Sequence, residues 1–204
     1  NKEELSAVVV LGGDGTILRA AYLVRDSKAP IIGINLGKVG FLAEISNPTP
    51  TDVINAIQSN NLVGEPRLTI EYKVLRDGKT IDSGWALNEF VIERSETTML
   101  ELFVQIDNRP LSRWGADAVI CATPTGSTAY SLSCGGPIIT PGCQVHILTP
   151  IAPHNLNVRP MVVPDHLPIE LSLEGRDRKY LISLDGNSKN IKQGEKIIVT
   201  KAEF

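Results

Sequence analysis

The chain has 204 residues, of which 42% are hydrophobic and 21% are charged. These are the proportions of an ordinary globular protein, so intrinsic disorder is excluded as the main description. Lys and Arg number 20 against 23 Asp and Glu, and aromatic residues make up 5%. This balance disfavours a strongly basic nucleic-acid-binding protein and a stacking platform for single strands.

Membrane and secretory features are not evident in the sequence. No apolar run approaches the roughly 18 residues that a spanning helix needs, and the first residues do not resemble a signal peptide. The three cysteines, Cys121, Cys134 and Cys143, form no CxxC pair. We therefore interpret them as buried free thiols in a reducing cytosol, and we expect a cytoplasmic protein that binds neither membrane nor nucleic acid.

The first part of the chain predicts alternating strands and helices. Residues 7–11 and 30–35 are continuous apolar runs, typical of strands covered on both faces. Apolar residues from Ile17 to Val24 recur at helical spacing, and residues 53–57 suit a second, short helix after a loop rich in Pro and Thr. Alternating units of this kind indicate a parallel α/β sheet.

After about Pro66 the pattern changes to successive strands, with hairpin turns indicated at 77–78 and 107–110. One helix is expected from about Gly126 to Ser133. Strands are expected at 68–75, 81–92, 100–106, 111–114, 118–122, 145–148, 169–173, 180–184 and 196–200. The predicted fold is therefore α/β: a small Rossmann-like part over residues 1–66, binding nucleotide, followed by a larger β-rich, β-sandwich-like domain over residues 67–204.

A glycine-rich loop follows the first strand: Gly12, Gly13, Asp14, Gly15 and Thr16. Glycines allow close approach to an anion, and the N-terminus of the next helix favours phosphate. The alternative is a tight turn with Asp14 or Thr16 as helix N-cap. An acid within the loop favours phosphoryl transfer, because it can orient a hydroxyl. The chain has no GxGxxG, and residues 33–39 lack the spacing and the Ser or Thr of a Walker A motif.

Residues 122–137 are dense in small hydroxylated side chains. Thr128, Tyr130, Ser131 and Ser133 offer hydroxyls suited to a nucleoside or sugar, unless the segment is only a small-residue helix packed on a sheet. No GxSxG elbow is present. The histidines His146, His154 and His166 lack metal-ligand spacing, and we interpret them as structural or surface residues.

Two sets of polar residues fall within or next to predicted strands. Asn88 and Glu89 interrupt an apolar run, where adjacent side chains point to opposite faces, unless they lie at a strand end or bulge. Asp117 precedes the strand at 118–122 and either accepts hydrogen bonds from a ligand amide or caps a turn.

Together these motifs resemble the NAD kinase family. The glycine loop at 12–16 also occurs in lipid kinases and phosphofructokinases, whereas Asn88-Glu89 followed by Thr-Pro-Thr-Gly-Ser-Thr-Ala-Tyr at 123–130 is specific to NAD kinases. Residues 33–35, 40–42, 135–137 and 150–154 also fit, so the resemblance covers nearly the whole chain. Members of the family usually have a further strand and helix before the glycine loop. We therefore expect this chain to lack part of the N-terminal region and to expose a sheet edge.

The resemblance implies transfer of the γ-phosphate of ATP, or of polyphosphate, to the 2′-hydroxyl of the adenosine ribose of NAD, giving NADP. Asp14 would be the catalytic acid–base residue, and Gly12, Gly13, Gly15 and Thr16 would form the phosphate loop. Mg²⁺ would bind mainly through ATP, and the protein would be a homo-oligomer. The implied substrate-binding residues are Asp14, Gly15, Arg19, Phe41, Asn88, Glu89, Asp117, Thr125, Thr128, Ala129, Tyr130, Ser131 and Ser133.

Asp185-Gly186, after the strand at 180–184, also resembles a family Asp near the site, on a short match. Two alternatives to an NAD kinase remain. One is a lipid or sugar kinase that shares the glycine loop, and the other is a nucleotide-binding remnant without catalysis.

Overall fold

The computed structural model describes residues 5–36, 40–43, 45–46, 48–59, 61–95, 98–174, 179–192 and 196–204. The chain divides into two compact units. One unit comprises Asn1–Pro66 together with Phe204, and the other comprises Arg67–Glu203. None of the described helices has the length and apolar character needed to cross a bilayer.

The first unit is built on a parallel sheet of three strands in the order β1 (Val8–Leu11), β2 (Ile31–Asn35) and β3 (Ile45–Ser46). The helix α1 (Asp14–Val24) connects β1 to the short 3₁₀ turn η2 (Arg25–Ser27). Of the apolar residues of α1 predicted from the helical spacing, Ile17, Ala21 and Val24 are buried and Leu18 is partly exposed. Ile17 packs with Val10 of β1 in one apolar cluster. The parallel α/β arrangement confirms the prediction for this part of the chain.

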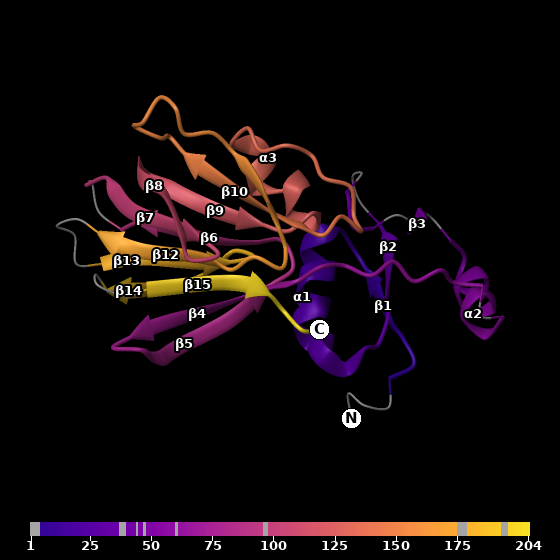
Figure 1. Ribbon diagram of the computed structural model, residues 1–204. Coiled ribbons are helices and arrows are strands. Elements are labelled where there is room, and N and C mark those ends of the chain that lie inside the picture. The colour runs from indigo at the N-terminus through magenta and orange to yellow at the C-terminus, as the bar shows by residue number, and fades with distance from the viewer. Residues whose placement is uncertain are drawn as a thin grey trace. The chain divides into compact units, whose positions relative to one another are not determined.

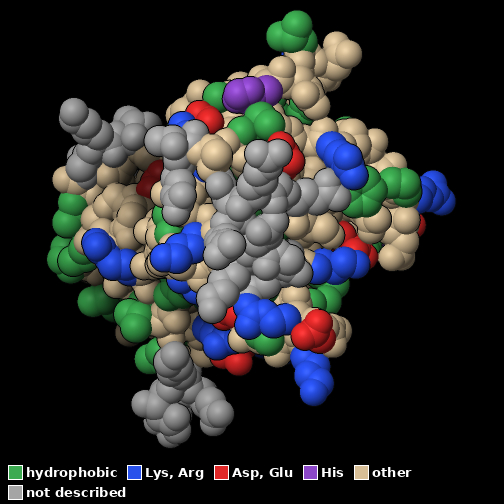
Figure 2. All heavy atoms as spheres, turned by 90° about the vertical axis from the view of Figure 1, so that its left-hand side faces the viewer, with side chains coloured by type: hydrophobic (Ala, Val, Ile, Leu, Met, Phe, Trp, Pro, Cys, Tyr) green, Lys and Arg blue, Asp and Glu red, His purple; other side chains and the backbone are tan. Residues whose placement is uncertain are grey.

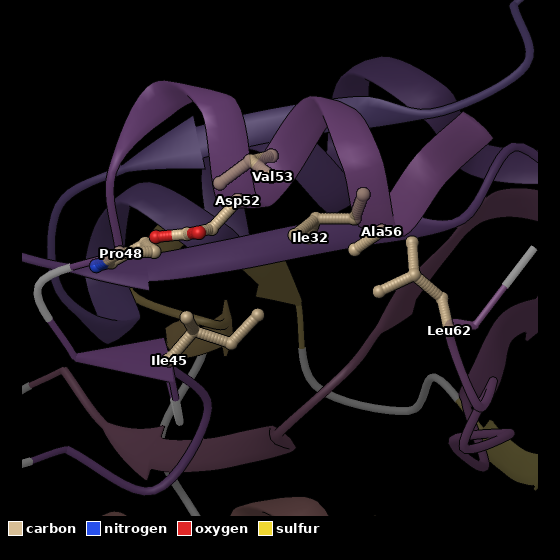
Figure 3. A pocket seen from close by; sticks show the side chains of 7 residues that line it. All are labelled: Ile32, Ile45, Pro48, Asp52, Val53, Ala56 and Leu62. Atoms are coloured by element: carbon tan, nitrogen blue, oxygen red, sulfur yellow. The ribbon is translucent and has the colours of Figure 1, made fainter. Parts of the chain in front are cut away.

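The second helix of this unit, α2 (Pro50–Gln58), begins with a capping box between Thr49 and Asp52, and Pro50 occupies its first turn. It encloses an apolar cavity of about 170 Å³ with the sheet. Figure 3 shows the lining side chains: Ile32, Ile45, Pro48, Asp52, Val53, Ala56 and Leu62. Because its walls are almost entirely hydrocarbon, this cavity is a packing feature and offers little to a charged ligand.

The second unit is a sandwich of two six-stranded sheets (Figure 1). One sheet has the order β11-β10-β9-β6-β13-β14 and the other β5-β4-β15-β12-β7-β8. The strands are β4 (Ile70–Arg76), β5 (Lys79–Ala86), β6 (Glu89–Arg94), β7 (Leu100–Ile106), β8 (Arg109–Ala116), β9 (Ala118–Ala122), β10 (Val145–Ile151), β11 (Met161–Pro164), β12 (Ile169–Glu174), β13 (Lys179–Leu184), β14 (Asn187–Lys192) and β15 (Lys196–Lys201). Alternate residues of both sheets form one core, which confirms the β-sandwich prediction.

Three hairpin turns share one geometry. Asp77-Gly78, Asp107-Asn108 and Asp185-Gly186 all have positive φ at both residues. This is the two-residue turn whose twist matches that of the flanking strands. The predicted hairpins at 77–78 and 107–110 are confirmed, although Arg109 and Pro110 already belong to β8.

The prediction of one helix from Gly126 to Ser133 is wrong. The segment forms the 3₁₀ turn η3 (Thr125–Thr128), a break at Ala129 with φ −96° and ψ −129°, and the short helix α3 (Tyr130–Ser133). Side chains compete with the helical ladder here, since the hydroxyls of Ser127 and Thr128 donate to the carbonyls of Pro124 and Thr125.

Charged side chains of both signs lie on the described surface, and some of them form ion pairs. On the face drawn in Figure 2, Lys and Arg are interspersed with Asp and Glu. Lys201 pairs with Asp165 at 2.7 Å and Lys73 with Glu71 at 2.9 Å. All three cysteines are free thiols. Only Cys121 is fully buried, which raises its pKa to about 12; Cys143 is exposed, so the prediction of burial is wrong for that residue.

Candidate active site

In the first unit, the acid of the glycine loop is held by backbone groups from another part of the chain. Gly13 is the N-cap of α1, and Asp14 is the first residue of the helix. The Asp14 carboxylate accepts hydrogen bonds from the backbone N–H of Phe41 at 2.9 Å and of Leu42 at 3.1 Å, one on each oxygen. No side chain caps α1, so the alternative of an N-cap at Asp14 or Thr16 is wrong.

Gly40 makes this contact possible. A Cβ atom at residue 40 would lie 2.3 Å from Asp14 Oδ1, which is far inside van der Waals contact. The Gly40-Phe41-Leu42 motif therefore forms a backbone clamp around the carboxylate. The clamp leaves each oxygen of Asp14 with further acceptor capacity, because a carboxylate has about four acceptor sites.

Among the other predicted residues of the first unit, Gly15 and Arg19 lie on α1, and Phe41 lies on the segment that follows β2. Gly15 is exposed, and a Cβ there would meet open space. Arg19 is exposed one turn along α1, and the Phe41 side chain is 60% exposed. These groups are accessible to a ligand, and their predicted roles stay predictions.

In the second unit, Asn88 and Glu89 lie where the chain leaves β5 and enters β6. Both residues are only 9% exposed. Asn88 Oδ1 and Glu89 Oε2 are buried, and none of the described residues hydrogen-bonds either atom. Burial, and then the charge of Asp185, raise the pKa of Glu89 to about 7. The pair therefore presents two buried polar atoms that lack a partner within the described chain, an arrangement that costs free energy unless a ligand or water satisfies them.

The hydroxyl-rich segment packs directly on this pair. The Thr123 N–H donates to the Asn88 carbonyl at 2.8 Å, and the Thr123 hydroxyl donates to the Leu87 carbonyl at 2.6 Å. A Cβ at Gly126 would lie 2.1 Å from the same Asn88 carbonyl oxygen. Two motifs that are distant in the sequence are thus brought together in one place, and Gly126 is required by the close approach.

The predicted hydroxyls of this segment fall into two groups. Ser131 is fully buried and its Oγ lies 2.9 Å from Thr149 Oγ1, so it is engaged within the protein, which favours a packing role over the predicted substrate contact. Thr125 is also buried. Tyr130 is 45% exposed and Ser133 is exposed, while Thr128 and Ala129 are partly buried.

Asp117 lies between β8 and β9 and is paired. Its carboxylate is 2.9 Å from the Arg94 guanidinium, and its backbone carbonyl accepts from the Arg94 N–H at 3.1 Å. The Asp117 side chain is 39% exposed, so it retains access to a ligand. Arg94 was not among the residues predicted from the sequence, since no local pattern distinguishes it from other surface arginines.

Asp185 also belongs to this site. Its carboxylate accepts from the backbone N–H groups of Leu87 at 2.8 Å, Asn88 at 2.9 Å and Glu89 at 3.0 Å. In the sequence, Asp185 was indicated only by the short Asp-Gly motif, which predicts a turn. That motif does not predict the contact with residues 87–89, which lie nearly a hundred positions earlier.

Comparison with models of known protein families shows which family the chain belongs to. Residues 1–61 match the ATP-NAD kinase N-terminal domain, and residues 87–204 match the ATP-NAD kinase C-terminal domain. The chain belongs to the NAD kinase family. The resemblance inferred from the motifs is thereby confirmed.

Individual NAD kinases are similar over nearly the whole chain. The NAD kinase of Flavobacterium psychrophilum is 40% identical over 199 residues, which cover 97% of this chain and 68% of that protein. The NAD kinase of Thermobifida fusca is 40% identical over 202 residues, covering 96% of this chain and 62% of its own length. The chain therefore spans about two thirds of these relatives.

Two solved structures share the fold. Yeast NADH kinase in complex with NADH superposes with a TM-score of 0.88 at 31% identity, covering 97% of this chain and 58% of the yeast chain. The NAD kinase from Archaeoglobus fulgidus in complex with ATP superposes with a TM-score of 0.76 at 29% identity, covering 99% of this chain and 76% of that one.

Proposed function

We propose that this chain transfers the γ-phosphate of ATP to the 2′-hydroxyl of the adenosine ribose of NAD, giving NADP. The family supports this proposal, as do solved relatives that bind NADH and ATP. The observation that carries it is the Asp14 carboxylate at the start of α1, inside the glycine loop and held by the N–H groups of Phe41 and Leu42.

The chemistry required of Asp14 is modest. Phosphoryl transfer depends mainly on alignment of the acceptor and on neutralisation of charge. A carboxylate with fixed direction and remaining acceptor capacity can accept a hydrogen bond from the ribose hydroxyl, aim it at the phosphorus and take its proton. Gly12, Gly13, Gly15 and Thr16 would cradle the phosphates, and Arg19 would add positive charge.

The proposed binding of NAD rests on two buried polar atoms, each without a hydrogen-bond partner among the described residues. Asn88 Oδ1 and Glu89 Oε2 are suited to the adenosine hydroxyls, and a bound ribose would supply the hydrogen bonds that both atoms lack. Asp117 would accept from the nicotinamide carboxamide. The remaining proposed contacts with adenine and ribose are Phe41, Thr125, Thr128, Ala129, Tyr130 and Ser133.

A divalent ion fits this site as a companion of ATP. Among the described residues, no three His, Cys, Asp or Glu side chains gather into a metal cage, and Asp14 is the acid within the glycine loop. A single carboxylate beside bound phosphates suits an ion such as Mg²⁺ that takes most of its ligands from phosphate oxygens. When bound, the ion would neutralise charge on the triphosphate. We also propose that the protein is a cytoplasmic homo-oligomer, which sedimentation and cell fractionation would test.

The test is NADP formation from NAD, ATP and Mg²⁺ by the purified chain, read with an NADP-specific dehydrogenase. Asp14→Asn should abolish most of this activity, whereas Asp26→Asn, at an exposed acid of η2, should leave it unchanged. The same assay is carried out with diacylglycerol, sphingosine-like compounds and fructose phosphate as alternative phosphate acceptors. Faster phosphorylation of one of these than of NAD would replace the proposal with the lipid or sugar kinase. NAD binding without turnover would replace it with the non-catalytic remnant.

A further inference from the structure

Two hairpins of the second unit are closed by the same dipeptide in the same conformation. Asp77-Gly78 joins β4 to β5 with φ of 51° and 74°, and Asp185-Gly186 joins β13 to β14 with φ of 45° and 86°. Asp77 is exposed. Asp185 instead turns its carboxylate onto the segment of residues 87–89. The local sequence accounts for both turns, and within the described parts of the chain it is the second one that makes a long-range contact.

The contact made by Asp185 is dense. One carboxylate oxygen accepts from Leu87 N–H, the other accepts from the N–H groups of Asn88 and Glu89, and the Asp185 N–H donates back to the Glu89 carbonyl at 3.2 Å. Three successive backbone N–H groups converging on one point are an anion-binding arrangement. Here the protein's own carboxylate occupies it, at the place where the chain crosses from one sheet to the other.

The segment that Asp185 holds is also the segment with the unpartnered atoms. Fixing the backbone of residues 87–89 fixes the direction in which the Asn88 and Glu89 side chains leave it. The Asn88 carbonyl is restrained from the opposite side by Thr123 N–H at 2.8 Å. The two side chains are therefore preorganised before any ligand arrives, which reduces the ordering cost of binding.

We propose that Asp185 is a positioning residue for NAD, which acts through the backbone of residues 87–89 to aim Asn88 and Glu89 at the adenosine ribose. This inference rests on the proposed function. The negative charge of Asp185 adds a second effect. Together with burial, which is the larger cause, this charge raises the pKa of Glu89 to about 7. The Glu89 carboxyl group is then partly protonated near neutral pH, so it can donate a hydrogen bond as well as accept one.

The experiment compares Asp185→Asn with Asp77→Asn, its matched control at the other Asp-Gly turn. Steady-state kinetics are measured from pH 5.5 to 8.5, in the original chain and in a Glu89→Gln background. We expect Asp185→Asn to raise KM for NAD about tenfold, with a smaller change in kcat, because hydrogen bonds to a charged acceptor are lost. We expect its pH midpoint for NAD binding to move to lower pH, and we expect Asp77→Asn to match the original chain.

In the Glu89→Gln background, the pH shift caused by Asp185→Asn should disappear. Asp185→Glu provides a second variant, which keeps the charge but displaces the carboxylate, and it should raise KM while leaving the pH midpoint nearly in place. If Asp185→Asn lowers only the melting temperature, with KM and the pH midpoint unchanged, Asp185 is a structural clamp and the inference is wrong. If the original chain itself forms no NADP, the proposed function fails instead.

Discussion

The two units each contain a carboxylate held by backbone N–H groups from a distant part of the chain, and the two carboxylates receive different numbers of donors. Asp14 receives two donors, one on each oxygen, from Phe41 and Leu42. Asp185 receives three donors from the segment 87–89. A carboxylate has about four acceptor sites, so Asp14 keeps more capacity for an incoming hydroxyl.

The difference suggests a physical way to separate a reacting acid from a supporting one. An acid that must accept a proton needs a fixed direction and a vacant acceptor site. An acid that shapes a binding segment works best when its acceptor sites are taken up by that segment. Asp14 and Asp185 are the same residue type, and the number of internal donors on each carboxylate is the observation that separates the two proposed roles.

Asp14→Asn should produce the largest effect and should separate the two carboxylates most clearly. Removing a general base costs typically 10²- to 10⁴-fold in rate, so kcat should fall by about that factor. KM for NAD should change little, in contrast to Asp185→Asn. Initial rates with varied NAD decide the matter, and a change confined to KM would show that Asp14 binds substrate without acting in the chemical step.

The pH dependence of stability should separate a buried group at the site from one outside it. Burial lowers the pKa of His146 to about 4, more than the nearby Asp165 raises it, from 6.5 in the unfolded chain. The unfolded chain then binds more protons between these values, so about 3 kcal/mol of stability should be lost as pH falls from 6.5 to 4. Glu89 acts with the opposite sign, because its folded pKa of about 7 lies above the unfolded 4.5 and stability falls as pH rises through that range.

The two pH ranges overlap and the contributions have opposite signs, so each is measured by urea unfolding as the difference between a variant, His146→Leu or Glu89→Gln, and the original chain. His146→Leu should remove the loss at acidic pH, and His166→Leu, at an exposed histidine, should retain it. Saturating NAD should change the difference between Glu89→Gln and the original chain and leave the difference between His146→Leu and the original chain as it was. An equal change in both differences would place His146 in the binding site and contradict its interpretation as a structural residue.

Gly126→Ala should lower the stability of the second unit more than a glycine-to-alanine change elsewhere in that unit. The new Cβ would lie 2.1 Å from the Asn88 carbonyl oxygen, which is backbone and cannot move without disturbing β6. Overpacking of this kind costs about 1–3 kcal/mol. We expect a lower melting temperature and weaker NAD binding. Gly115→Ala is the control, since its Cβ would meet the flexible side chain of Met99 at 2.6 Å. Equal losses in the two variants would contradict the importance of this contact.

Much of the fold could be predicted from local patterns, because alternation and turn residues act over a few positions. The strands β7 and β9 match the expected ranges residue for residue. The strand β14 was missed because Asn187–Lys192 is mostly polar and pairs only as an edge strand. The strand β11 was missed because it ends in Pro164, and proline argues against a strand except at an edge.

The candidate site was less accessible to sequence reasoning, because its contacts join distant residues. The segment at 122–137 indicated several hydroxyls equally, yet the fold buries Ser131 against Thr149 and leaves Ser133 exposed. Likewise, the Asp-Gly signal at residue 185 is identical to that at residue 77. Only the three-dimensional arrangement shows which hydroxyl is buried and which Asp-Gly turn contacts residues 87–89.

Gly40→Ala should give the smallest change and the sharpest test of the clamp on Asp14. The added Cβ overlaps Asp14 Oδ1, which is the end of a side chain and can rotate away, so the fold should survive. Rotation breaks a hydrogen bond to a charged group, worth about 1.5 kcal/mol, and this corresponds to about tenfold in kcat. Gly64→Ala, where a Cβ meets open space in the same unit, should match the original chain.

Unchanged kcat in Gly40→Ala, with melting temperature also unchanged, would mean that the clamp does not set the direction of the carboxylate. Asp14 would then be oriented by its substrate, and the difference in the number of N–H donors on Asp14 and Asp185 would no longer explain their proposed roles.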